Sequence, residues 1–474
     1  MRTIPLFLLV GCLGDPHVDC VTDVECRDAF GFGQQCGDIG YCEAAELPAR
    51  CTTSYPTDLL SDPAAYSDAV IFGSLGDGLF DSAEMSSVRL AFIEAERAGG
   101  IDGTPVALVE CTYEENPDID DLPYPDSVAL LGEALAGRFG IQGFIGPYTS
   151  GQTEALFNAT QAERPFIISP SATSPALTFI DGVDKSDETP GTLWRTAPPD
   201  SLQGQVAAQD MIARGRTRVA VVYQSGAYGD GLAQIFTEQF TSSDRTTLGL
   251  PFGDTSELAA HVSTIEADPT IQEVFVISGE ASDVAAFLNG AGSLLSFDDE
   301  TGPGRGIFLA DAAKDTDMLD ALTEDGRTLL DQIRGTAPAA PNATDTTYNT
   351  FKQVYEQQFP GQDAEATIYM PYSYDAAWLA LYAATWSRAQ EGGLTGAGMG
   401  AGMRQVSSGD EIQLLSTDWN TGRALLDAGR SIDVKGSSGA LDYDPATEET
   451  TAPMDVWVVN AAGDGFETTE TVDP

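Results

Sequence analysis

From about residue 66 onward, short apolar runs alternate with longer amphipathic segments. Each run lacks the polar alternation of a half-exposed strand, so it predicts a strand buried on both faces. Between the runs, residues 83–98 place Val88 and Phe92 on one face and end at Gly99-Gly100, which predicts a helix. Alternation of this kind predicts parallel sheets with right-handed crossovers, hence an α/β fold. The predicted strands are 69–72, 106–109, 143–145, 166–168, 219–222, 274–277 and 307–309.

The segments that follow the predicted strands share a chemistry. They are rich in Gly, Ser, Thr and Tyr, and one of them, Thr149 to Gln152, resembles a capping box that opens a helix. In open parallel sheets, ligands bind beyond the carboxyl ends of the strands, where such residues expose N–H groups and hydroxyls. A phosphate loop at 73–78 is disfavoured, because GSLGDG lacks the Lys-Ser/Thr pair and carries an aspartate. The segments are 73–78, 146–152, 169–174, 223–229 and 278–282.

The charge balance excludes several classes of partner. The chain has 73 acidic and 23 basic residues, a net charge of −50. A surface this negative repels nucleic acid and anionic lipid, and it suits solubility in a salty habitat better than an acidic docking function. The two histidines, His17 and His261, lie far apart in sequence, so a histidine base or a histidine-rich zinc site is not expected.

The N-terminus has the pattern of an export signal. Residues 1–11 contain one basic residue and an apolar run that is too short for a spanning helix. The rest of the sequence has no apolar run long enough for one either. The run ends in Leu9-Val10-Gly11-Cys12, which resembles the lipobox cut by the bacterial lipoprotein signal peptidase. The resemblance implies that Cys12 carries lipid, and that lipid alone holds the chain on a membrane as a periplasmic or cell-surface lipoprotein. The rival interpretation is an ordinary signal peptide with an incidental cysteine.

Removing Cys12 leaves an even number of cysteines, which after export predicts three disulfides. Residues 20–42 are rich in Gly and Asp and nearly lack an apolar face, so they predict a small cross-linked module within a stalk over 12–60. A four-cysteine zinc site is the rival, but the spacing lacks the close pairs of zinc ribbons. Cys51 and Cys111 remain to tie the stalk to the body, and the pairing is left open. The six candidates are Cys20, Cys26, Cys36, Cys42, Cys51 and Cys111.

Several segments resemble the branched-chain amino acid binding proteins of the type I periplasmic binding protein family. The similarity runs in order over about 66–470 and leaves the cysteine-rich stalk outside. Its most specific parts are Ser-Pro-Ser-Ala-Thr-Ser-Pro at 169–175 and Tyr-Gly-x-Gly-Leu-Ala at 228–233. The matching segments are 86–109, 143–153, 165–178, 194–209, 219–236 and 437–449.

The resemblance implies two lobes, each a doubly wound and mostly parallel sheet, joined by three crossing strands and closing over a ligand. By analogy the first lobe holds 66–195 and 338–438, and the second holds 196–337 and 439–470. Residues 112–127, which are strongly acidic, form an insertion relative to the family, and Gly396 to Gly402 reads as a flexible loop.

The resemblance also implies ligand contacts where the motifs match. Ser150 falls at the helix start that receives an amino acid's carboxylate, and Ser171 and Thr173 fall in the loop that meets its amino group. Tyr228 matches a tyrosine of the second lobe that closes over the ligand. Glu280 departs from the family's usual aromatic residue, and Asp311 lies near its acidic ammonium partner. Taken singly, each of these is equally compatible with a cap, turn or packing role.

We therefore expect capture of an amino acid or similar small polar molecule, with no cofactor, no metal and no catalysis. The leading hypothesis is an ABC importer whose permease subunits lie on other chains, and the alternative is a sensory or surface lipoprotein without transport. An acidic hydrolase that uses Asp442 and Asp444 is the third class, but the same residues fit a turn. The sequence leaves the ligand, membrane leaflet and oligomeric state open.

Overall fold

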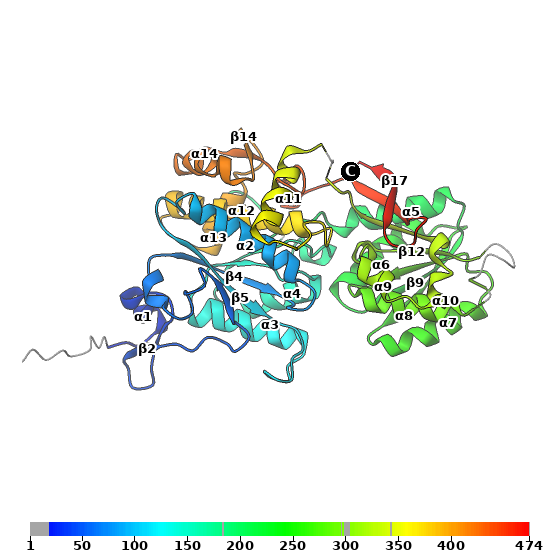
Figure 1. The fold of residues 1–474 in the computed structure, drawn as a ribbon, viewed down its shortest axis with the longest axis horizontal. Helices are drawn as coiled ribbons and strands as arrows, with labels where there is room; N and C mark the ends of the chain where they lie inside the picture. Colours follow the sequence, from blue (N-terminus) through cyan, green and yellow to red (C-terminus); the bar gives the residue numbers. More distant parts are fainter. Residues whose placement is uncertain (1–18, 183, 295, 298–303, 342–343, 474) are drawn as a thin grey trace, which may run out of the picture.

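The computed structural model describes residues 19–473, apart from 183, 295, 298–303 and 342–343. The predicted signal peptide over 1–11, Cys12 and His17 lie outside the described residues. The described chain forms two bodies side by side, with a small module at the far end of the first (Figure 1).

The first body is built on a six-stranded sheet of order β3-β5-β4-β6-β7-β8. All neighbours pair in parallel except β3, which lies antiparallel at the edge beside β5. Because β4, β6 and β7 are buried along their whole length, and β5 up to Cys111, they appear as mainly apolar runs in the sequence. The strands are β3 (Thr53–Tyr55), β4 (Val70–Gly76), β5 (Val106–Thr112), β6 (Gly143–Ile145), β7 (Phe166–Ser169) and β8 (Leu193–Arg195).

The second body holds a seven-stranded sheet of order β10-β9-β11-β12-β13-β16-β17. Its first five strands are parallel, and β16 and β17 continue the sheet in antiparallel fashion. The strands are β9 (Arg218–Gln224), β10 (Thr246–Phe252), β11 (Glu273–Ile277), β12 (Gly306–Leu309), β13 (Ile333–Pro338), β16 (Met454–Val459) and β17 (Phe466–Val472). All seven predicted strands lie on observed strands, and the predicted α/β fold is confirmed.

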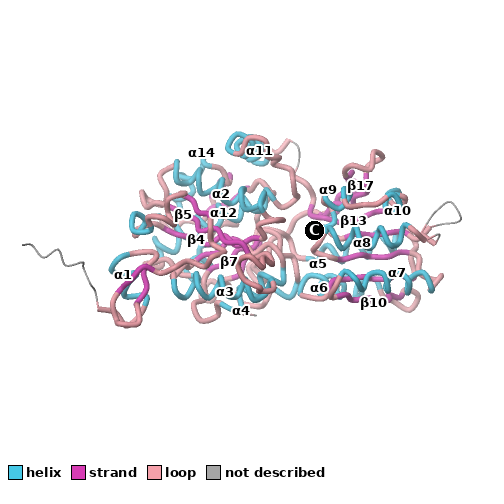
Figure 2. The backbone as a smooth tube through the Cα atoms, turned by 60° about the horizontal axis from the view of Figure 1, so that its bottom comes forward, coloured by secondary structure: helices cyan, strands magenta, loops and turns pink. Residues whose placement is uncertain are grey.

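Helices and strands form alternating layers in both bodies (Figure 2). The predicted helix over 83–98 is confirmed as α2, and a 21-residue helix, α12, lies almost wholly buried beside it. The first body carries α2 (Ser82–Arg97), α3 (Tyr124–Gly132), α4 (Ser150–Ala159), α11 (Thr346–Gln358), α12 (Met370–Gln390), α13 (Gly396–Met403) and α14 (Ser416–Asp427), with a small sheet of β14 (Asp410–Gln413) and β15 (Ile432–Lys435). The second carries α5 (Asp200–Ala213), α6 (Ala227–Phe240), α7 (Leu258–Ala267), α8 (Ala281–Gly292), α9 (Thr316–Asp320) and α10 (Glu324–Arg327).

The chain passes between the two sheets three times: after β8, after β13 and before β16. The last passage is held by buried polar contacts. Arg195, at the end of β8, forms a buried ion pair with Glu449, and the Tyr443 hydroxyl donates to the Arg195 carbonyl at 2.9 Å. The stretch 439–450 therefore contacts residues of the first body, although the family analogy draws a lobe boundary at 439.

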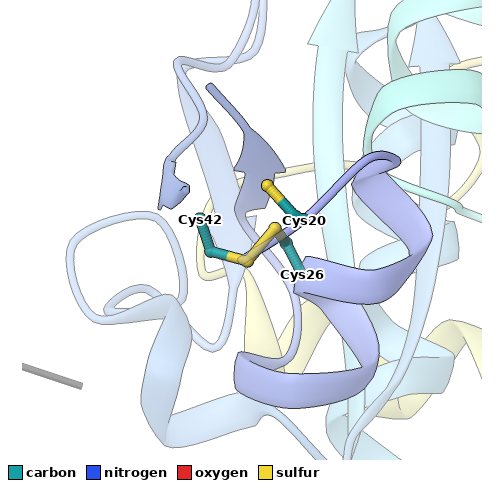
Figure 3. Close-up of side chains that lie close together, drawn as sticks. All are labelled: Cys20, Cys26 and Cys42. Atoms are coloured by element: carbon teal, nitrogen blue, oxygen red, sulfur yellow. A yellow bond between two sulfur atoms is a disulfide. The ribbon is translucent and has the colours of Figure 1, made fainter. Parts of the chain in front are cut away.

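The N-terminal module consists of α1 (Asp23–Phe30), β1 (Gln34–Cys36) and β2 (Cys42–Ala44). Two disulfides, Cys20–Cys36 and Cys26–Cys42, cross-link it, and a third, Cys51–Cys111, ties the segment before β3 to β5. Cys20, Cys26 and Cys42 lie close together (Figure 3), but their sulfurs are consumed in disulfides rather than available as zinc thiolates. The three predicted disulfides are thus confirmed, and the zinc alternative fails in the module.

The predicted loop at Gly396 to Gly402 is wrong, because these residues form helix α13, capped by the Thr395 hydroxyl, which accepts from the Gly398 N–H at 3.0 Å. Glycine is used here for close packing. A Cβ on Gly400 would lie 2.2 Å from the Gly191 carbonyl oxygen, and one on Gly396 would lie 2.0 Å from that of Arg164. Composition alone suggested flexibility, whereas burial against backbone fixes the segment as a helix.

We expect Gly400→Ala to destabilise the protein by about 1–3 kcal/mol, because the added methyl must displace backbone. Gly290→Ala is the matched control. It lies within helix α8 and its Cβ would meet only Val262 at 3.7 Å, so it should be neutral or stabilising by up to about 1 kcal/mol. Urea unfolding followed by tryptophan fluorescence measures both. A Gly400→Ala protein as stable as the wild type would contradict the packing account.

Candidate ligand-binding site

A cavity of about 530 Å³ lies between the two bodies. Its wall comes from segments that follow β4, β5, β6 and β7 of the first sheet and β9, β11 and β12 of the second, together with residues 367–369 ahead of α12. The carboxyl ends of both sheets therefore meet at one place, which is where a parallel sheet exposes unpaired backbone and short polar side chains. The sequence predicted the strand-end segments after β4, β6, β7, β9 and β11, but not those at 113–125 and 311–321, nor the stretch 367–369.

Among the helices that begin at this wall are α4 at Ser150, α6 at Ala227 and α8 at Ala281. The N–H groups of a helix's first turn have no intrahelical partner and carry partial positive charge. The predicted capping box at 149–152 is wrong in its hydrogen bonds, since the Thr149 side chain makes no cap bond and its hydroxyl is buried without a partner. The first turn of α4 thus keeps its N–H groups for something other than its own cap.

Five of the six residues singled out from the sequence line the cavity: Ser150, Ser171, Tyr228, Glu280 and Asp311. The sixth, Thr173, is buried behind the wall and donates its hydroxyl to Asp200 at 3.0 Å.

Ser150 and Ser171 also hold the wall together. The Ser150 hydroxyl accepts from the Ser174 N–H at 3.1 Å, and the Ser171 hydroxyl donates to the Tyr148 carbonyl at 2.6 Å. These bonds tie the loop after β6 to the loop after β7. The Ser150 hydroxyl accepts one bond here and keeps its O–H to donate, and its backbone N–H lies in the first turn of α4.

Asp311 is one of the most heavily hydrogen-bonded groups of the wall. Its carboxylate accepts from the Tyr228 hydroxyl at 2.5 Å, from the Gln203 amide at 2.9 Å, and from the Tyr369 hydroxyl of the first body. Nearby, burial and then the charge of Asp311 raise the pKa of Asp200 well above its usual range. Burial and the neighbouring charge of Asp311 therefore both disfavour the ionised form of Asp200.

The remaining wall is acidic. Seven carboxylates and one ammonium group, that of Lys314, line the cavity, with no arginine. Burial raises the pKa of Glu280, with further increases from the charges of Asp283 and Asp77, and burial lowers the pKa of Lys314. Burial also raises the pKa of Glu84 to about 7, with a smaller contribution from Asp315, against the lowering effect of its hydrogen bond from Thr367.

Sequence reasoning missed Glu84, Tyr148, Lys314, Asp315 and Tyr369. Glu84 reads as an ordinary first-turn helix acid, and Asp315 reads as a helix cap. Tyr369 comes from a stretch with no strand before it, so no local pattern marks it. Asp77 could have been found, because it follows a predicted strand directly.

We expect the stability of the protein to fall as pH rises from about 4.5 to about 7, in part through Glu84. Its pKa is raised above the unfolded value of 4.5 to about 7, so the native state keeps a proton that the unfolded chain has released. Glu84→Gln removes this effect. Relative to the wild type, the variant should be similar at pH 4 and more stable by up to about 3 kcal/mol at pH 8.

Chemical denaturation from pH 4 to 8 measures this difference, with the exposed Glu411→Gln as the matched control. A Glu84→Gln stability difference that does not change with pH would show that the burial of this carboxyl has no effect on folding.

Comparisons with known proteins agree with this architecture. Residues 124–461 match the family described as the receptor family ligand binding region. The chain is 26% identical over 408 residues to the chemotactic signal transduction system substrate-binding protein BasB of Halobacterium salinarum, covering 84% of this chain and 86% of that protein. It is 30% identical over 152 residues to the Leu/Ile/Val-binding protein BraC3 of Rhizobium johnstonii, covering 32% of this chain and 37% of that one.

Among solved structures, the fold is similar to that of the leucine binding protein LivK of Thermotoga maritima, with a TM-score of 0.64 and 17% identity over 86% of this chain and 99% of that one. The family match covers most of the chain and both sheets end at one interlobe cavity. The chain therefore belongs to the receptor ligand-binding-region family, with the type I periplasmic-binding fold.

Proposed function

We propose that this protein is an extracytoplasmic solute-binding protein that captures a small, amino-bearing molecule between its two lobes. The observation that carries the proposal is the single cavity that joins the Asp311 carboxylate to the open first turn of α4. A carboxylate suits an ammonium group, and a helix N-terminus suits an anion. Together they fit a zwitterion such as an amino acid.

The hydrogen bonds that cross the cavity also support closure of the two lobes around a ligand. Asp311 belongs to the second body and accepts from Tyr369 of the first, so the interlobe contact already includes the proposed ammonium site. Its two oxygens can accept about four hydrogen bonds, and three donors are present, which leaves room for a ligand N–H. A solute that contacts both lobes stabilises the closed arrangement by its differential affinity.

Binding without catalysis is the function we propose. His261 bonds to the Pro251 carbonyl and does not line the cavity. Of the acids considered for hydrolysis, Asp444 accepts the N–H groups of Ala446 and Thr447 in a turn, and neither Asp442 nor Asp444 reaches the cavity. The relatives described above are named as binding proteins.

The first test is calorimetric titration with L-amino acids. We expect at least one to bind the wild type, and Asp311→Asn to weaken that binding by at least about 30-fold, because the ligand cation loses its buried charged acceptor. Asp331→Asn, on an exposed turn of the second lobe, is the control and should bind as the wild type does. Unchanged binding by Asp311→Asn would remove the proposed ammonium site.

We also propose that Cys12 is lipidated after cleavage of residues 1–11. In the described part of the chain, no helix has the length and hydrophobicity of a membrane span. Expressed with its own N-terminus, the protein should partition into detergent, and Cys12→Ser should leave it in the aqueous phase. A Cys12→Ser protein that partitions like the wild type would contradict lipidation.

The bound solute has two candidate receivers: the permease of an ABC importer, or a sensory partner. The Leu/Ile/Val-binding relative supports an ABC importer, whereas the chemotactic relative, which is similar over most of both chains, favours delivery to a sensory partner. Deletion of the gene separates them. Loss of solute uptake supports import, and loss of the tactic response with uptake intact supports sensing.

A further inference from the structure

The acidic wall of the cavity exceeds what one ammonium group needs. An amino acid with a neutral side chain brings no net charge, yet seven carboxylates and one ammonium surround it. The ammonium, Lys314, lies 3.9 Å from Asp455 and is already turned toward that acid. Placing a neutral solute here would leave the first-lobe carboxylates without a counter-charge, which is costly in a buried site.

The side chain of Glu84 shows this lack of a positively charged partner in its hydrogen bonds. Its side chain is 5% exposed, and one carboxylate oxygen accepts from the Thr367 hydroxyl. The other oxygen is buried and has no hydrogen-bond partner. The hydroxyl of Tyr148, which lines the same cavity, is also buried without a partner. Buried polar atoms are rarely left unsatisfied. Among the described residues, the Glu84 oxygen therefore lacks a donor, and the Tyr148 hydroxyl, which can donate or accept, lacks a partner.

The second lobe adds negative charge opposite this site rather than relieving it. Asp315 faces Glu84 closely enough to raise its pKa, after the larger effect of burial. Glu280 likewise faces Asp77, and no hydrogen bond or ion pair to its carboxylate is present in the described residues. Burial and these neighbouring acids disfavour the charged forms of Glu84 and Glu280, and a cation bound between the lobes favours those charged forms.

The missing group is an organic cation rather than a metal ion. In the part of the chain that the structure describes, only the disulfide cysteines form a cluster of three potential metal ligands within 4.8 Å of one another. The carboxylates are spread along the wall, which suits N–H donors on a carbon chain. A volume of about 530 Å³ lies in the range of small organic ligands.

We propose that Glu84 is the centre of a second cation-binding subsite, and that the preferred solute carries two cationic nitrogens, as a basic amino acid or a diamine does. The α-amino group binds at Asp311, and the distal ammonium donates to the unpartnered oxygen of Glu84 and to the Tyr148 hydroxyl. This inference rests on the proposed capture function and adds the charge of the solute to it.

The test compares L-lysine with L-norleucine, which has the same carbon chain without the distal amine. Calorimetry uses the full chain in about 1 M KCl, where the Debye length is about 3 Å and surface charge is screened, while the buried wall is screened far less. We expect lysine to bind at least tenfold more tightly than norleucine. Glu84→Gln should abolish this preference with norleucine affinity changed less than threefold, whereas Asp311→Asn should weaken both ligands.

Two further variants test whether the Glu84→Gln change acts through charge or only by disturbing the structure of the wall. Asp315→Asn, which acts from the opposite lobe and keeps an acceptor for the Asp317 N–H, should reduce the lysine preference in part. Glu411→Gln, exposed on β14, should leave it unchanged. Binding of cadaverine alone, abolished by Glu84→Gln, would also support the second subsite.

The outcomes separate the two proposals. Norleucine that binds as tightly as lysine, or a lysine preference that persists in Glu84→Gln, overturns the second subsite and leaves capture intact. Failure of every amino acid and diamine to bind the wild type overturns the capture function, and the subsite with it.

Discussion

The buried carboxylate of Asp311 is the interaction on which the interlobe site depends. It accepts from Gln203 and Tyr228 of the second body and from Tyr369 of the first, so one charge positions three side chains and joins the two lobes. Burial and then the charge of Asp311 raise the pKa of its neighbour Asp200. Because Thr173 bonds to Asp200, its side chain supports the site from behind, whereas Ser171 of the same loop lines the cavity.

The junction between the lobes is fixed by buried polar contacts of the same kind. Arg195 pairs with Glu449, and Asp375 on α12 accepts four hydrogen bonds from the N–H and hydroxyl groups of Ser437 and Ser438. Burial raises the pKa of Asp375 to about 6 against the lowering effect of those bonds. Removing either partner would leave a buried group unsatisfied, so the crossing segments have a defined path while the lobes remain separate bodies.

The acidic residues of the chain have two distinct physical roles. Most contribute to the net charge of −50 from solvated positions, where salt screens them. Those of the cavity wall are removed from water, so burial raises the pKa of several, and their mutual repulsion persists in salt. Composition alone cannot distinguish these roles, because the distinction is one of solvent exposure.

The sequence by itself determined seven of the strands, the parallel α/β fold and most of the strand-end segments that form the cavity, because strands buried on both faces leave continuous apolar runs. It also placed Ser150, Tyr228 and Asp311 at one cavity, through motifs local to a strand and its loop. Only the tertiary structure decided what depends on distant partners: the helix at 396–403, the disulfide pairing, the withdrawal of Thr173 behind the wall, and the meeting of Glu84 with Thr367 and Tyr148. These features follow from burial between segments far apart in the chain, which no local pattern of residues records.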